Sequence, residues 1–158
     1  MSIKSNKWKI IDIISWGDKY FNKKGFSNGR LEIEWFLCYL LNYNRVDLYL
    51  KFEQIITDEQ LASFRSMIKR RLAGEPFQYI IGKGSFYGRD FIVNSDVLVP
   101  RPETELIINR LMKKDPSLHL MDIGTGSGCI AITCVLENLS KNVYATDISL
   151  NALKIAKQ

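Results

Sequence analysis

Apolar residues in the first 75 positions recur at the spacing of helices. Residues 8–14 carry apolar side chains on neighbouring faces at intervals of three and four. The Asn28-Gly29 pair interrupts this pattern, which returns over residues 31–41, and a short helix is expected at residues 46–52. These intervals predict a bundle of short helices.

The end of this helical region is also marked in the sequence. Thr57, followed three residues later by Gln60, forms a capping box, and the helix that begins there is expected to end near Ala73, before Gly74 and Pro76. The bulky aromatic residues of the region are expected to form the core of the bundle, namely Trp8, Trp16, Trp35, Phe36, Tyr39 and Phe64.

After Gly74 the pattern becomes that of strands. Residues 78–81 and 86–94 are rich in β-forming side chains, and Gly82, Gly84 and Gly88 can supply the turns, so we predict a hairpin here. A helix is expected to begin at Pro102 and to end at Asp115-Pro116. There follows the order of a βαβ unit, with strand 118–123, helix 127–139, strand 143–146 and a helix capped by Ser149.

Composition narrows the class of protein. The chain has 158 residues, a net charge of +5 and no uncharged apolar run long enough for a membrane span. Its N-terminus lacks an apolar block and a cleavage site of the kind found in signal peptides, so we expect a cytoplasmic protein.

The cysteines do not indicate a metal site. The spacing of Cys38, Cys129 and Cys134 is not that of metal ligands, and His119 is the single histidine, so no metal site is expected. The three thiols are interpreted as free and buried.

The chemical signal is the segment DIGTGSGCIAI, residues 122–132. A strand brings Asp122 to a turn in which Gly124, Gly126 and Gly128 let a ligand approach the backbone at the start of a helix. Asp147 follows the next strand, where its carboxylate can accept the hydroxyl protons of a ribose. We therefore expect a nucleoside cofactor, bound by Gly124, Thr125, Gly126, Ser127, Gly128 and Asp147.

The spacing of the glycines discriminates between cofactors. A dinucleotide fingerprint needs its third glycine at relative position six, where this chain has Cys129, and no Lys-Ser or Lys-Thr pair follows to make a P-loop. Glycines at relative positions one, three and five, preceded by an acid, are instead similar to motif I of methyltransferases that use S-adenosylmethionine. That cofactor is favoured over NAD and over a purely structural turn.

A second segment of the sequence resembles a known family. It is residues 75–105, EPFQYIIGKGSFYGRDFIVNSDVLVPRPETE. This segment closely resembles the linker hairpin and the Pro-Arg-Pro-Glu-Thr-Glu segment of the release-factor glutamine methyltransferases, the PrmC/HemK family. The resemblance implies an α/β protein with a helical substrate-recognition bundle (1–75), a hairpin linker (76–102) and the first part of a Rossmann-like methyltransferase domain (103–158). It also adds the weaker cofactor-site candidates Asp122, Ile148, Arg101, Glu103 and Thr104.

The family transfers a methyl group to the side-chain nitrogen of the glutamine in the Gly-Gly-Gln loop of a peptide release factor. The release factor is therefore the partner that the resemblance implies, and no direct nucleic-acid binding is expected. An amide nitrogen is a poor nucleophile, so catalysis rests on alignment and on acceptors for its hydrogens. The family supplies these acceptors from an Asn-Pro-Pro-Tyr motif, but no Asn-Pro pair occurs in this chain. Consequently no catalytic residue is assigned.

The resemblance covers only the first two of about seven strands of such a domain. We therefore expect a truncated enzyme that keeps its helical bundle, has a frayed βαβ portion and is inactive alone. Two alternatives stay open. One is a methyltransferase of the same lineage with another protein or a nucleic acid as its target, and the other is a docking module without catalysis.

Overall fold

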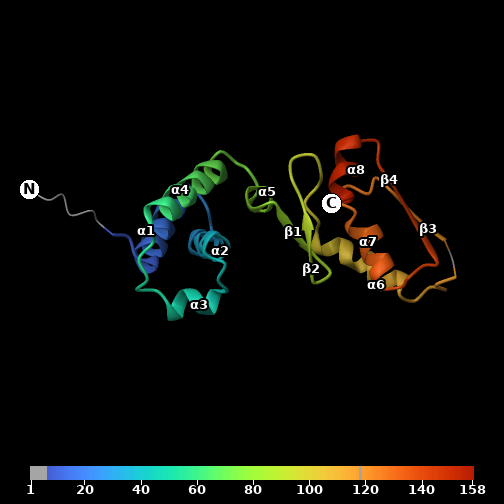
Figure 1. The fold of residues 1–158 in the computed structure, drawn as a ribbon, viewed down its shortest axis with the longest axis horizontal. Coiled ribbons are helices and arrows are strands. Elements are labelled where there is room, and N and C mark those ends of the chain that lie inside the picture. Colours follow the sequence, from blue (N-terminus) through green and yellow to red (C-terminus); the bar gives the residue numbers. More distant parts are fainter. Residues whose placement is uncertain (1–6, 118) are drawn as a thin grey trace, which may run out of the picture. The chain divides into compact units, whose positions relative to one another are not determined.

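The computed structural model describes residues 7–117 and 119–158, and these residues divide into two compact units, one ending at Glu75 and the other beginning at Pro76. The first unit contains the helices α1 (Ile10–Lys23), α2 (Gly29–Leu41), α3 (Arg45–Leu50) and α4 (Asp58–Leu72) (Figure 1). The predicted capping box is present, because Thr57 and Gln60 each accept a hydrogen bond from the other's backbone N–H. The four helices predicted in this region are confirmed.

Aliphatic and phenylalanine side chains, rather than tryptophan, fill the interior of this unit. The buried positions include Ile10, Ile13, Ile33, Phe36 and Phe64. Helices α1 and α2 approach so closely that a Cβ atom on Gly17 would lie 2.6 Å from Cγ1 of Ile33.

The prediction that the six aromatic residues form the core is therefore wrong for three of them, and Trp8 is half-buried. Trp16, Trp35 and Tyr39 keep 38%, 40% and 48% of their surfaces exposed, respectively, whereas Phe36 and Phe64 are buried as expected. Large rings that carry a polar N–H or O–H group fit at the edge of such a tightly packed interior, where that group can reach water.

A buried carboxylate connects α2 to α3. The side chain of Glu34 has no exposed surface, yet its oxygens accept hydrogen bonds from Tyr49 Oη at 2.7 Å, from Arg30 Nε at 3.0 Å and from Arg45 Nη2 at 2.6 Å. Burial acts to raise the pKa of Glu34, but the hydrogen bonds from Tyr49, Arg45 and Arg30 outweigh it and lower the pKa below its ordinary value. The carboxylate is therefore charged and fully paired.

The second unit begins with a single turn of helix, α5 (Phe77–Ile81), where a strand was predicted at residues 78–81. That prediction is wrong. Pro76 precedes the turn with φ −57°, and Gly82 ends it in the left-handed conformation with φ +73°. A short apolar run of this kind is equally compatible with a strand and with a buried turn of helix, so only the flanking residues decide.

A two-stranded hairpin follows, as predicted, but its strands lie at other positions than expected: the first comes after residues 78–81, and the turn falls inside the predicted strand 86–94. Strand β1 (Lys83–Phe86) pairs antiparallel with β2 (Arg89–Ile92) through a turn formed by Tyr87 and Gly88. Both turn residues have positive φ, +50° for Tyr87 and +71° for Gly88, which is the pattern of a type I′ turn. The backbone N–H of Tyr87 donates to Glu105 Oε1 at 2.8 Å, and its hydroxyl donates to Asn109 Oδ1 at 3.2 Å. Two contacts thus hold a non-glycine residue in this conformation.

The predicted βαβ unit is confirmed. Strand β3 (His119–Ile123) pairs in parallel with β4 (Asn142–Thr146), and α7 (Cys129–Leu136) connects them. The unit is preceded by the 3₁₀ turn η1 (Pro102–Thr104) and helix α6 (Glu105–Leu111), and it is followed by α8 (Leu150–Ala156), which Ser149 caps as predicted. Helix α6 thus ends before the predicted stop at Asp115-Pro116, and α7 is shorter than the predicted 127–139.

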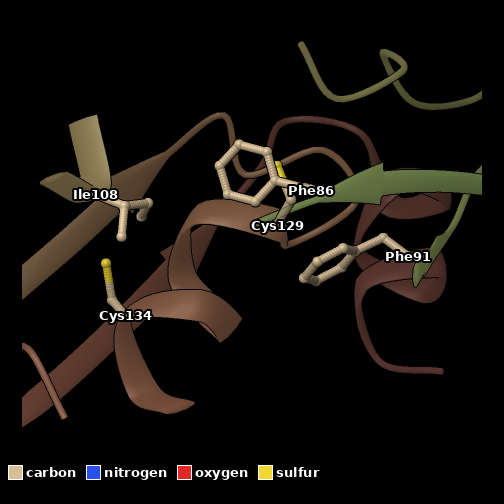
Figure 2. Packing of buried hydrophobic residues seen from close by; sticks show 5 residues of the cluster. All are labelled: Phe86, Phe91, Ile108, Cys129 and Cys134. Atoms are coloured by element: carbon tan, nitrogen blue, oxygen red, sulfur yellow. The ribbon is translucent and has the colours of Figure 1, made fainter. Parts of the chain in front are cut away.

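The core of the second unit joins the hairpin to the βαβ unit. Figure 2 shows Phe86 beside Cys129 at the start of α7, while Ile108 and Cys134 point toward one another. Phe91 completes this cluster, so the hairpin supplies two aromatic rings to the core that α6 and α7 share. Of the cysteines interpreted as buried, Cys129 and Cys134 are so, whereas Cys38 is half-buried.

One face of the two-stranded sheet packs on α7 and the other is open. Leu120 and Val143, which face each other across the strands, contact the core cluster. The alternate residues Met121, Ile123 and Tyr144 point to the opposite face and keep 61%, 79% and 53% of their surfaces exposed.

None of the helices in the described residues is long and apolar enough to cross a bilayer.

We predict that Glu34→Gln lowers the free energy of unfolding by about 1–3 kcal/mol, because a buried charged acceptor is lost while its donors remain. Urea unfolding monitored by circular dichroism measures this loss, and Glu59→Gln on the exposed surface of α4 is the matched control.

The effect of Glu34→Gln should also depend on pH. The folded-state pKa of Glu34 is depressed, so the contribution of its carboxylate to the free energy of unfolding is present above the ordinary glutamate pKa and is lost as the pH falls through the depressed value. The difference between wild type and Glu34→Gln should therefore shrink in acid. A difference that is constant down to strongly acidic pH would contradict this account.

Candidate functional site

The candidate site lies where the two parallel strands end. The carboxyl ends of parallel neighbours meet at one edge of a sheet, which is where open α/β folds place ligands. Strand β3 ends at Ile123 and leads into residues 124–128, the glycine loop, while β4 ends at Thr146 and leads into Asp147. The topology thus brings both predicted elements to the same edge.

The glycine loop has a backbone that other residues adopt only with strain. Gly124, Gly126 and Gly128 have φ values of +79°, +56° and +79°. A Cβ atom added at Gly124 or Gly126 would meet nothing within 4 Å, so these two glycines present bare backbone to open space. At Gly128 a Cβ would lie 2.9 Å from Cδ1 of Ile132, so this glycine permits the loop to pack on α7.

Backbone and side-chain hydrogen bonds fix the course of the loop. The carbonyl of Thr146 accepts from the N–H groups of both Gly124, at 2.8 Å, and Thr125, at 2.9 Å, which ties the loop to the end of β4. The buried Thr125 hydroxyl donates to Asp122 Oδ2 at 2.7 Å. Asp122 therefore holds the turn together.

Asp147 connects the loop to α8. Its Oδ2 accepts from the Gly126 N–H and its Oδ1 accepts from the Ser149 N–H, both at 2.9 Å. These backbone donors, Ser149 first and then Gly126, lower the pKa of the Asp147 carboxyl below its ordinary value. The Ile148 N–H adds a smaller contribution, so the group is an anion near neutral pH with acceptor capacity left for a further donor.

The remaining predicted site residues are placed differently. Ser127 is buried within the loop, and the side chain of Ile148, next to Asp147, is fully exposed. Arg101 and Glu103 are exposed and Thr104 is half-buried. Within residues 7–117 and 119–158, these three make no hydrogen bond or ion pair with the glycine loop. Their assignment to the cofactor pocket stays a prediction.

Two contributors to the site were missed from the sequence. The Thr146 carbonyl, which accepts from two loop amides, is a main-chain group and therefore leaves no side-chain signal. Ser149 was assigned only as a helix cap, yet its N–H also positions Asp147. The Ser149 position could have been inferred, because an Asp two residues before a capping serine commonly accepts that backbone hydrogen bond.

The site contains no evident metal-binding group. Among the described residues, no cluster of three or more His, Cys, Asp or Glu side chains could hold an ion. Burial raises the pKa of the Cys129 thiol at the start of α7, so this group is protonated near neutral pH and does not act as a thiolate.

Two models of known protein families match parts of the chain. Residues 12–82 match the model of the PrmC N-terminal domain, and residues 102–158 match that of the methyltransferase small domain. The glycine loop and Asp147 both lie in the second match. The fold and the match together place the chain in the class of methyltransferases.

The chain belongs to the family of the release factor glutamine methyltransferases. It is 39% identical to the protein of that name from Bacillus cereus, over 95% of this chain and 54% of the relative. It is 37% identical to that of Geobacter sulfurreducens, over 100% and 56%, and 40% identical to that of Bacillus subtilis, over 93% and 53%. The chain thus spans about half the length of the curated relatives that it matches.

We predict that Gly128→Ala destabilises the chain more than Gly88→Ala. Both glycines have a similar positive φ, so each substitution costs about 1 kcal/mol in backbone strain. At Gly88 the new methyl group meets nothing within 4 Å, whereas at Gly128 it meets Ile132 and Ala156, which should add about 1–3 kcal/mol. Thermal unfolding followed by circular dichroism gives the comparison. Equal losses for the two variants would show that Gly128 is not closely packed.

Proposed function

We propose that the second unit binds S-adenosylmethionine at the glycine loop and Asp147, as part of a cytoplasmic protein-glutamine methyltransferase that acts on peptide release factors. The observation that carries the proposal is the 2.9 Å hydrogen bond between the Gly126 N–H and Asp147 Oδ2. It places bare loop backbone and an anionic acceptor side by side at the carboxyl edge of a parallel sheet.

The residues present suit each part of this cofactor. Open backbone at Gly124 and Gly126 leaves room for the amino-acid portion against the loop. The charged Asp147 can accept ribose hydroxyl protons, because its hydrogen bonds to backbone N–H groups leave acceptor capacity on the carboxylate. The exposed Ile148 offers an apolar surface next to that acid for the base. When bound, the cofactor supplies a methyl group activated by its sulfonium sulfur.

The proposed substrate comes from the names of the relatives, which are release factor glutamine methyltransferases. A glutamine amide nitrogen is weakly nucleophilic, so transfer depends on alignment with the donor and on acceptors for the amide hydrogens. In this proposal the described residues hold the donor. The Asn-Pro-Pro-Tyr motif that would accept the amide hydrogens is not among these 158 residues.

Calorimetric titration tests the cofactor site. We expect the 158-residue chain to bind S-adenosylmethionine and Asp147→Ala to bind it at least about tenfold more weakly, because a charged acceptor of two ribose hydroxyls is lost. Asp90→Ala, in the exposed hairpin strand β2, is the control and should bind as the wild type does. Equal affinity of wild type and Asp147→Ala, with both folded, would refute the site.

A chimera tests the proposed reaction. In it, residues 1–158 replace the segment that they match in the Bacillus subtilis relative, so that the rest of that protein supplies the acceptor motif. We expect the chimera to methylate the Gly-Gly-Gln glutamine of a bacterial release factor, and the same chimera with Asp147→Ala to lose most of its rate, on the order of 100-fold. Mass spectrometry of the release factor locates the methyl group. A folded chimera that binds cofactor but leaves this glutamine unmodified would refute the substrate.

A further inference from the structure

A groove that is apolar over most of its length runs along the first unit between α1 and α4. It consists of three neighbouring hollows of about 270, 180 and 250 Å³. The first and second share Trp8 and Leu61 in their walls, and the second and third share Trp16 and Arg65. Leu72 lines the far end, so the groove follows α4 from Leu61 to Leu72, a distance of about 16 Å or three helical turns.

Three neighbouring aromatic rings, those of Trp8, Trp16 and Tyr20, line one wall of the groove. Trp16 makes an edge contact with Trp8 at 6.2 Å between ring centroids and stacks on Tyr20 at 5.0 Å. The ring of Trp16 stands between two hollows and leaves 38% of its surface exposed, although an aromatic core was expected. Such a row of part-exposed rings is typical of contact surfaces for other proteins.

Two basic side chains at the rim of the groove are not paired with any acidic side chain that the structure describes. Arg65 and Lys69 line the rim from α4, are exposed, and make no hydrogen bond or ion pair with any residue that the structure describes. The next two cations along the helix are paired, Arg70 with Glu75 and Arg71 with Glu32. Compensation of the helix dipole could explain Lys69 in the last turn of α4 but not Arg65 in the middle of that helix.

The only acidic residue in the described lining is Asp58, at the end of the groove where Lys7 also lies. The remainder of the groove therefore offers positive charge and apolar surface. It is complementary to a partner that carries acidic and apolar side chains in alternation along one face.

We propose that the α1–α4 groove is a docking site for an acidic amphipathic helix of a partner protein. The apolar face of that helix fills the three hollows, and its carboxylates pair with Arg65 and Lys69. A helix fits better than an extended strand, because both walls are helices whose backbone groups are already paired. A second copy of this chain would instead bring Arg65 and Lys69 opposite their own counterparts, which repel. The proposal goes beyond cofactor binding and does not depend on it.

A stapled helical peptide serves as the probe, with leucines at i, i+4, i+7 and i+11 and glutamates beside them. We expect the full chain to bind this labelled peptide in fluorescence anisotropy and to bind a peptide with lysines in place of the glutamates at least about tenfold more weakly. The double variant Arg65→Glu with Lys69→Glu should reverse this preference. Lys113→Glu with Lys114→Glu, an exposed basic pair in the second unit, is the matched control and should keep the wild-type preference.

Circular dichroism melting tests whether each variant is folded. We expect all of them to fold, because the four substituted side chains, Arg65, Lys69, Lys113 and Lys114, are exposed. Trp16→Ala removes the wall that two hollows share and should weaken binding of the acidic peptide as well. The proposal is overturned if the folded wild type binds neither peptide at about 1 mM, if it binds both equally, or if charge reversal leaves the preference unchanged. It is also overturned if sedimentation shows a dimer that excludes the peptide, because a second copy would then occupy the groove.

Discussion

The carboxylate of Asp147 joins the separate segments of the candidate site. Asp147 accepts one backbone N–H from the glycine loop and one from the start of α8, so three segments are held at one edge of the sheet. Hydrogen bonds to a charged acceptor are stronger than those between neutral groups. The three glycines of the loop, Gly124, Gly126 and Gly128, all have positive φ. Glycine adopts positive φ without a steric clash, but it adopts negative φ about as readily, so the glycines alone do not favour this loop conformation. Asp147, together with the Thr146 carbonyl, provides that preference.

The hairpin also has a structural role beyond connecting two regions. Phe86 and Phe91 belong to the same buried cluster as Ile108, Cys129 and Cys134 (Figure 2). The hairpin therefore packs on α7, which also contacts β3 and β4. The N-terminal end of α7, which receives the glycine loop, is therefore enclosed by residues from well before it in the sequence. The division into a linker at 76–102 and a methyltransferase domain that begins at 103 stays a prediction, and residues 76–158 pack as one compact unit.

Sequence patterns predicted the features that depend on local spacing. The helices of the first unit, the Thr57 capping box, the parallel βαβ order and the proximity of Asp147 to the glycine loop were all accessible in this way. Residues 78–81 were not, because one apolar turn of helix and one short strand have the same composition. The exposure of Trp16 and the burial of the charged Glu34 could not be predicted from the sequence either. Both depend on which side chains of the neighbouring helices occupy the interior. The roles of Arg101, Glu103 and Thr104 rest on family resemblance alone and stay predictions.

Tyr87 has a consequence for any attempt to transplant the hairpin into another scaffold. A tyrosine with φ +50° is unfavourable by itself, and here Glu105 and Asn109 of α6 hold it through its N–H and its hydroxyl. Moved without α6, the same hairpin would lose both anchors and its turn would relax. The β-hairpin and the first two turns of α6 therefore form one exchangeable module, and protein engineers would need to exchange them together.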